Sequence, residues 1–479
     1  MVFSSLEFIF FYLPAVLLIY FLIPAKFLAA RNFALFIVSL LFYGWSEPTY
    51  IWIMLLSIAV DYTCGRLISK YKQTKRRIAK MALIASVVIN LSILGFFKYA
   101  DFIIANLSAI PIFSGLKPLG VPLPVGISFY TFQTMSYTLD VYLGEACVQK
   151  NIASFGSYVT MFPQLIAGPI VRYRDVDADL RQRSHNIDNI ARGIKRFVCG
   201  LAKKVLLANT AGTFYKSFVD GVSGNPSVVG AWMGIVFFAF QIYFDFSGYS
   251  DMAIGLGYIL GFKFPENFNY PYISKSITEF WQRWHISLGS WFRDYVYIPL
   301  GGSRVGKIRL LFNILTVWML TGFWHGATWN FVVWGLYFAA FLIIEKLFLL
   351  NKLEKFKVLN HIYVLFFVII SFVIFNAADL PEAMQYIGAM FGAGDYPLIS
   401  AECIYYAESY ALTFVIAIFA ATPIAKNVIN KAKENETREN LINVLEVLHS
   451  CSSYFSQQHT LWMDHLIHSC TSDSKEALQ

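Results

Sequence analysis

A histidine lies between two segments that are apolar enough to enter a lipid bilayer. His325 occurs in TGFWHGATWN, and the flanking segments are LLFNILTVWML and FVVWGLYFAAFLII. Neutral imidazole takes up a proton near neutral pH, so His325 is a candidate general base. The alternative is an interfacial histidine that is hydrogen-bonded between helices, because polar side chains in membranes usually face the protein interior. We expect four indole rings around the imidazole, those of Trp318, Trp324, Trp329 and Trp334.

A second histidine has a similar aromatic setting. His285 lies in EFWQRWHISL, 40 residues before His325. Two imidazoles that converge from different segments would form one site. Taken alone, a histidine in this setting is more often an interfacial or structural residue.

Carboxylates and other polar groups interrupt the apolar run QIYFDFSGYSDMAIGLG. They are Gln241, Asp245, Ser247, Ser250 and Asp251. Intramembrane carboxylates are functional hypotheses by default. Asp245 and Asp251 are therefore either a functional pair or structural partners of backbone and arginine groups in a water-filled cavity.

Two arginines lie at the end of an earlier apolar stretch, in GPIVRYRD (168–175). Arg172 and Arg174 are explained by the positive-inside rule, since basic residues anchor the cytoplasmic ends of membrane segments. The alternative is that they hold the phosphates of a cytoplasmic donor, because guanidinium groups pair well with phosphate.

The C-terminal tail contains half of the eight histidines. They are His449, His459, His465 and His468, and Cys451 and Cys470 lie among them. Their spacing matches no common zinc site, and the six cysteines of the chain form no CxxC pair. We expect no metal site, no disulfide framework and no function for this tail.

The composition is that of a polytopic membrane protein. Only 14% of the 479 residues are charged, where a soluble protein has about 25%. The mean hydropathy is +0.55. The net charge of +8 fits basic cytoplasmic loops and gives no indication of nucleic-acid binding. We therefore expect membrane lipids around the chain and no nucleic-acid partner.

Segments of about 20 apolar residues identify the candidate spans. They are 3–24, 32–47, 49–64, 80–98, 121–144, 228–244, 246–262, 308–324, 330–348, 360–376 and 405–424. The first has no basic n-region and no cleavage site, so we interpret it as a retained span.

Charge bias predicts the orientation of these spans. Segment 66–80 carries seven Lys or Arg and no acid, which places it in the cytoplasm. Counting spans from there puts the N-terminus outside and the basic residues of 346–357 inside. Segment 377–404 carries four acids and no Lys or Arg, and it falls outside.

Three regions do not have the pattern of simple spans. Residues 152–170 are apolar but contain Pro163, Gly168 and Pro169, which predicts a re-entrant segment buried in protein. Residues 263–309 mix aromatic and charged residues and predict interfacial helices that dip in from the cytoplasmic side. Residues 187–205 predict an amphipathic basic helix at the cytoplasmic surface.

Several blocks resemble the membrane-bound O-acyltransferase (MBOAT) family and, within it, the bacterial alginate O-acetylation branch. They are PLPVGISFYTFQTMSYTLDVYLGE, MFPQLIAGPIVRYRD, YFDFSGYSDMAIGLGYILGFKFPENFNYPY, FWQRWHISLGSWFRDYVYIPLGG and TGFWHGATWNFVVWG. The resemblance implies an acyltransferase domain over 1–425, with about eleven transmembrane helices and re-entrant segments around a tunnel. It assigns the signature histidine to His325 and a second site residue to His285. Residues 426–479 turn polar and depart from the family pattern.

The resemblance also implies a reaction. The expected donor is cytoplasmic acetyl-CoA, used as a substrate, with no permanently bound cofactor. The expected acceptor is an extracytoplasmic polysaccharide, with a separate acetyltransferase outside the membrane as partner. The location would be the bacterial inner membrane. The alternatives are a proton-coupled transporter or flippase, for which internal repeats are expected and none is found, and a non-catalytic scaffold of a glycan synthase.

Overall fold

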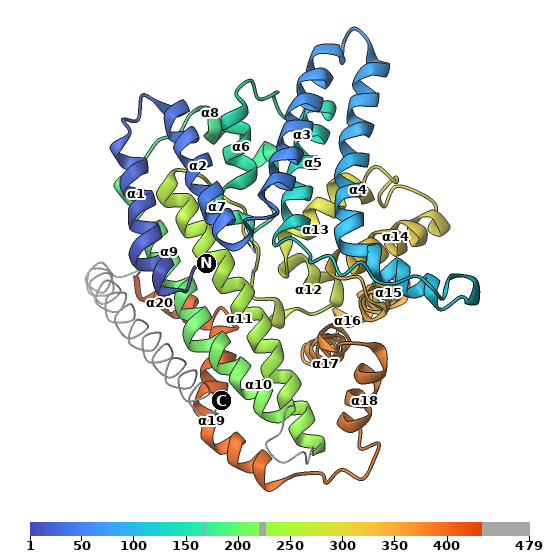
Figure 1. The fold of residues 1–479 in the computed structure, drawn as a ribbon. Helices are drawn as coiled ribbons and strands as arrows, with labels where there is room; N and C mark the ends of the chain where they lie inside the picture. The colour runs from blue at the N-terminus through green and yellow to red at the C-terminus, as the bar shows by residue number, and fades with distance from the viewer. Residues whose placement is uncertain (167, 220–226, 434–479) are drawn as a thin grey trace, which may run out of the picture.

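A computed structural model gives the fold for residues 1–166, 168–219 and 227–433 (Figure 1). Every regular element in these residues is a helix. Seven of the described helical runs are long and apolar enough to cross a membrane. They are α2 (Leu28–Ser46), α3 (Ile51–Tyr71), α4 (Arg76–Ser108), α11 (Val228–Leu260), the run Trp329–Leu353, α17 (Leu359–Asn376) and α19 (Ala401–Ala420). The predicted all-helical polytopic architecture is confirmed, and the count of about eleven crossings stays a prediction.

The first five predicted spans each coincide with helical structure. Besides α2, α3 and α4, they are η1 (Phe8–Tyr12) with α1 (Leu13–Leu22), and α5 (Ile127–Leu143). The fourth is longer than predicted, since α4 has 33 residues. A helix of that length measures about 50 Å, whereas the hydrocarbon core of a bilayer is about 30 Å thick. α3 and α4 stand side by side and project beyond their neighbours, with the basic segment 66–80 at their tip (Figure 1).

The prediction of two spans at 228–244 and 246–262 is wrong, because the single helix α11 covers both. Its partner is the helical run 187–219, which packs antiparallel along it (Figure 1). That run consists of α9 (Ile187–Ala202), η3 (Lys203–Asn209) and α10 (Thr210–Val219). Residues 187–205 are amphipathic as predicted, but they form the first part of this hairpin and not a separate surface helix.

Glycines allow the two arms of the hairpin to touch through their backbones. A Cβ on Gly193 would lie 2.6 Å from the carbonyl oxygen of Gly255. A Cβ on Gly200 would lie 2.5 Å from the carbonyl oxygen of Gly248. Gly248 and Gly255 of α11 therefore let the neighbouring helix approach closely.

The two irregular regions contain short helices, as their sequences predicted. Residues 152–170 hold α6 (Ile152–Thr160) and α7 (Phe162–Leu165), and both are almost entirely buried. The chain leaves the helical conformation between them at Met161, two residues before Pro163, which has no N–H for an intrahelical bond. In the other region, α12 (Ile277–Arg283) and α13 (Ile286–Phe292) have seven residues each, or about 10 Å, which is too short to cross a bilayer.

The C-terminal half forms a second bundle around the other end of α11. α14 (Lys307–His325) pairs with α15 (Trp329–Ile344), and α17 lies against α15. α11 joins the halves, since residues 252–260 pack into one large apolar cluster and residues 231–244 into another. The remaining helices are η2 (Pro111–Phe113), α8 (Tyr173–Arg181), η4 (Pro271–Ile273), η5 (Arg293–Tyr297), η6 (Glu345–Leu349), α16 (Leu350–Leu353), α18 (Leu380–Met390) and α20 (Ile424–Lys433). The tail histidines and cysteines at 449–470, for which no metal site was predicted, lie outside the described residues.

Candidate active site

His325 is the last residue of α14. The hairpin with α15 holds it in place through two glycines. A Cβ on Gly322 would lie 2.4 Å from the carbonyl oxygen of Phe331, and one on Gly335 would lie 2.5 Å from that of Trp318. Because both positions lack a side chain, the backbones touch and the imidazole is brought against the first turns of α15.

Two residues of α4 hold the end of α14. Tyr99 donates its hydroxyl to the carbonyl oxygen of Phe323, and Lys98 donates its ammonium to that of Trp324. The last four carbonyls of a helix have no intrahelical partner and carry partial negative charge, so both donors stabilise this end. Neither residue was predicted from the sequence.

Fewer tryptophans surround His325 than the sequence predicted. Its ring lies 4.9 to 5.2 Å, between centroids, from Trp324, Trp334 and Phe375. Trp318 instead packs on Trp281 at 4.6 Å, and Trp329 is half-exposed and donates to Asn106. The expected cluster of four indoles is therefore wrong, and two of them frame the imidazole.

His285 occupies an unusual backbone position between α12 and α13. Its φ is +45°, in the left-handed region that residues with a side chain rarely adopt. Asn267 holds this turn, because its Oδ1 accepts from the N–H and the hydroxyl of Ser287, at 3.2 and 2.8 Å. The same Oδ1 lies 3.2 Å from Nδ1 of His285.

These contacts determine the tautomer of His285. A backbone N–H can only donate, so the Asn267 atom that faces Ser287 is the oxygen, and the Nδ1 of His285 that faces the same oxygen carries the proton. Nε2 then holds the lone pair. The side chain is 2% exposed, and Nε2 has no hydrogen-bond partner among the described residues.

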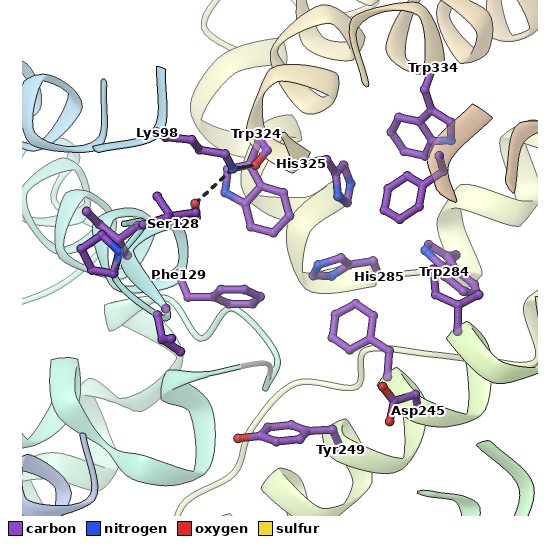
Figure 2. Close-up of a pocket in the computed structure, with 18 of the residues that line it drawn as sticks. Lys98, Ser128, Phe129, Asp245, Tyr249, Trp284, His285, Trp324, His325 and Trp334 are labelled. Atoms are coloured by element: carbon purple, nitrogen blue, oxygen red, sulfur yellow. Dashed lines mark hydrogen bonds between the residues drawn. The ribbon is translucent and has the colours of Figure 1, made fainter. Parts of the chain in front are cut away.

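A cavity of about 560 Å³ brings the two histidines together. Figure 2 shows both imidazoles facing this space, with Lys98 and Trp324 on one side and Asp245 on the other. Residues 123–129, at the start of α5, complete the wall. His285 and His325 line the same cavity, as the sequence predicted. The volume is in the range of ligand sites, about 300 to 1,000 Å³.

A second cavity of about 570 Å³ lies toward the other end of α15. Arg293, Lys346 and Leu350 form part of its wall, together with residues of α12, α13 and α14. The two cavities share one lining residue, His285. We call them the histidine cavity and the basic cavity.

The predicted acidic residues have basic partners in the α9–α11 hairpin. Asp251 accepts from Arg196 at 2.8 Å and from Lys203 at 2.7 Å. Asp245 forms an ion pair with Lys204 at 2.5 Å, and it also lines the histidine cavity. Gln241 packs against Gly212 in the hairpin and lines neither cavity. The two aspartates are thus not paired with each other.

Arg172 and Arg174 converge on one carboxylate. Asp294 accepts from Arg172 at 2.6 Å and from Arg174 at 2.5 Å, and Arg293 donates to its other oxygen. Partial burial opposes the charged form, but the guanidinium groups of Arg293, Arg172 and Arg174 outweigh it and lower the pKa of Asp294. Arg172 and Arg174 therefore contact Asp294 and do not line the basic cavity. Asp294 in turn pairs with Arg293, which does line it.

Comparison with known proteins identifies the family. The family model for membrane-bound O-acyltransferases, MBOAT, matches residues 37–380. The chain belongs to the MBOAT family. It is therefore an acyltransferase, and its helices are those of a multi-pass membrane protein.

Curated relatives give the closer comparison. A probable alginate O-acetylase, AlgI, of Azotobacter vinelandii is 40% identical over 402 residues, which cover 83% of this chain and 79% of the relative. A peptidoglycan O-acetyltransferase of Helicobacter pylori is 34% identical over 82% of this chain and 80% of the relative. A teichoic acid D-alanyltransferase of Bacillus subtilis is 30% identical over 47% of this chain and 59% of the relative. The resemblance to the MBOAT family and its alginate O-acetylation branch is confirmed.

Within this acyltransferase, Asn267 is a testable positioning residue. If His285 acts in the reaction, Asn267→Ala is expected to lower the acyl-transfer rate about 10- to 100-fold, as loss of the hydrogen-bond partner of a metal-bound histidine typically does. Asn267→Asp keeps the accepting oxygens and is expected to restore most of the rate. The measurement is the turnover of purified protein, normalised to the folded amount.

The matched control lies in the same loop. Asn269 is exposed, so Asn269→Ala is expected to keep the wild-type rate. Equal rates for Asn267→Ala and wild type would contradict the positioning role of Asn267.

Proposed function

We propose that this O-acyltransferase transfers an acetyl group from cytoplasmic acetyl-CoA to the hydroxyl of an extracytoplasmic acceptor that serves polysaccharide O-acetylation. The names of the relatives support acetyl transfer to glycans. The observation that carries the proposal is the meeting of two cavities at His285. A donor in one cavity and an acceptor in the other would come into contact at the two imidazoles.

The distribution of charge supports the proposed sides. The basic cavity lies beside Lys346, near the basic segment 346–357, and positive charge steers anionic CoA toward it. The histidine cavity lies toward the start of α15, where Asn330 donates to the carbonyl oxygen of Ala377 beside the acidic segment 377–404. By the positive-inside rule, the first side is cytoplasmic and the second is outside.

The hairpin keeps the proposed orientation consistent. The N–H of Val228 donates to Pro397, so the start of α11 lies on the side of 377–404. Tyr20 donates to the carbonyl oxygen of Leu260, so the end of α11 lies beside the basic segment 26–31. α11 crosses the membrane once, where two crossings were predicted for 228–244 and 246–262. In the proposed topology the run 187–219 makes the second crossing, so the total is unchanged. The proposed topology therefore keeps the N-terminus outside and the protein in the bacterial inner membrane.

The proposed reaction begins with removal of a proton. His325 accepts the proton of the acceptor hydroxyl while the hydroxyl oxygen bonds to the thioester carbon, and the carbonyl electron pair moves onto its oxygen. The intermediate collapses, the carbon–sulfur bond breaks, and CoA leaves as a thiolate. The proton passes from His325 through Nε2 of His285 to that thiolate. His285 also aligns the two substrates, since positioning supplies much of the rate in such a transfer.

The remaining predicted residues support this arrangement from outside the reacting centre. The ion pairs of Asp251 and Asp245 would fix the hairpin that forms one wall of the tunnel. Arg172 and Arg174 would act on the donor phosphates through Arg293, which they hold by way of Asp294. A separate acetyltransferase outside the membrane would complete the transfer to glycan.

The test uses protein reconstituted in sealed vesicles. Labelled acetyl-CoA is supplied on one side and an acceptor glycan, with the extracytoplasmic partner, on the other. We expect labelled acetyl ester on the glycan only when the donor is on the side of segment 66–80. Vesicles without protein are the control. Release of intact acetyl-CoA on the far side would support the transporter alternative, and no transfer from either side would reject the proposal.

Cysteine labelling fixes the sides in the same vesicles. In a variant without the exposed native cysteines, Gln73→Cys and Asp395→Cys should react with an impermeant reagent from opposite sides. Labelling of both from one side would contradict the proposed topology.

A further inference from the structure

Lys98 is the feature that the proposed reaction leaves unexplained. It lies on α4, 22 residues after the helix begins and 10 before its end, well inside a membrane-spanning element. An ammonium group at such a position is costly, and it is usually paired or functional. No carboxylate lies within ion-pairing distance of Lys98 in the part of the chain that the structure describes.

The charges around the histidine cavity do not balance. Apart from the two imidazoles, the acidic or basic residues that line the cavity are Lys98 and Asp245. Asp245 is already paired with Lys204. The charge of Lys98 is therefore left for whatever occupies the cavity.

One donor of Lys98 remains available. The ammonium has three N–H groups. One is directed to the carbonyl oxygen of Trp324 and one to the hydroxyl of Ser128, at 3.4 Å, as Figure 2 shows. Ser128 lies in the first turn of α5, and residues 124–129 line the same cavity. The first N–H groups of a helix have no intrahelical partner and carry partial positive charge.

Two independent features thus favour negative charge beside the histidines, the ammonium of Lys98 and the start of α5. His285, whose buried Nε2 has no partner in the described residues, lines the same space. Both substrates of the proposed transfer are uncharged at the reacting atoms. Negative charge appears there only when the thioester oxygen becomes an oxyanion.

We propose that Lys98 is a catalytic residue that stabilises this oxyanion during acyl transfer. The inference rests on the proposed function, because it concerns the same site. The third N–H of Lys98 donates to the oxygen that receives the carbonyl electron pair, and no proton is transferred. A fixed donor in a site that excludes water acts mainly in the transition state, where the charge develops.

The test compares three purified variants in the acetyl-transfer assay. Lys98→Gln loses the charge, and its side chain ends one bond short of the ammonium position, so the donor no longer reaches the oxyanion. The kcat is expected to fall about 10²- to 10³-fold, the typical effect of removing one oxyanion donor. The KM values for donor and acceptor should stay within about twofold of wild type, because a group that acts only in the transition state does not change ground-state binding. Lys98→Arg keeps the charge and is expected to retain most of kcat.

Tyr99→Phe is the matched control. Tyr99 holds the same end of α14 through the neighbouring carbonyl but does not line the cavity. Loss of this support should lower kcat much less than Lys98→Gln does. If Tyr99→Phe and Lys98→Gln lower kcat equally, Lys98 only supports the end of α14, and the proposal is overturned.

Two other outcomes also overturn it. An unchanged kcat with a raised KM for the acceptor would mean that Lys98 binds an anionic group of the acceptor. Full activity of Lys98→Gln would remove any role. Absence of transfer by the wild-type protein would instead reject the proposed function itself, so the two failures are distinguishable.

Discussion

Replacement of His325 by alanine is expected to abolish measurable acyl transfer while the protein still folds and inserts. A positioned acid–base group typically contributes about 10² to 10⁴ in rate. The imidazole makes no hydrogen bond to the described residues, so its loss leaves no buried donor or acceptor unpaired. The measurement pairs the transfer assay with the yield of monodisperse protein in detergent.

Other histidines provide the comparison. His361 donates from Nδ1 to the carbonyl oxygen of Ser274 and lines neither cavity, so the His361→Ala protein should keep the wild-type activity. His285→Ala should be milder than His325→Ala, because water can partly replace an orienting group. A structural role for His325 would instead lower the folded amount, since an unpaired buried group costs about 1–3 kcal/mol. Full activity of folded His325→Ala would reject the mechanism.

Gly322→Ala is expected to have the opposite signature, with loss of folded protein. The added Cβ would lie 2.4 Å from the carbonyl oxygen of Phe331 and 3.3 Å from Cα of Gly335. Both are backbone atoms, so α14 and α15 would have to separate. Overpacking of this kind typically costs about 1–3 kcal/mol. The measurement is the thermal midpoint and yield of detergent-purified protein.

Gly95 is the matched glycine for this prediction. It also lies in a long membrane helix, α4, but a Cβ there would meet nothing within 4 Å. Gly95→Ala should keep or slightly raise stability, because alanine is the better helix former. Equal stability of the two variants would show that the close contact of α14 with α15 is dispensable.

The hairpin of α9 and α11 explains where prediction of the fold failed. Hydropathy measures the composition of one segment and does not include its partner. The predicted spans 228–244 and 246–262 were divided at Asp245, and the basic residues of 187–205, Lys204 among them, predicted a surface helix. In the structure Lys204 and Asp245 form an ion pair across the helix contact. The broken segments were predicted better, because proline and short apolar runs are local signals.

For the site as well, residues with a local sequence signal were predicted, and residues whose role depends on distant contacts were missed. His285 and His325 were found because imidazoles are conspicuous in apolar sequence. Lys98 was missed because the predicted span 80–98 ended on it, where a lysine reaches the interface without cost, whereas α4 continues to Ser108. Asn267 was missed because a loop amide has no recognisable spacing, and its role depends on contacts with residues about 20 positions away.

The wall between the histidine cavity and the basic cavity, which both share at His285, also has an electrical consequence. In a membrane protein the voltage falls mainly across the parts that exclude water, so two facing cavities concentrate it in the wall between them. The proposed proton path, from the outer hydroxyl to the inner thiolate, carries one positive charge inward through that wall, while the acetyl group that moves outward is neutral. One elementary charge is worth about 2.3 kcal/mol per 100 mV. An energised membrane, negative inside, would thereby drive acylation forward, and the cell could export acyl groups at the expense of its ion gradient.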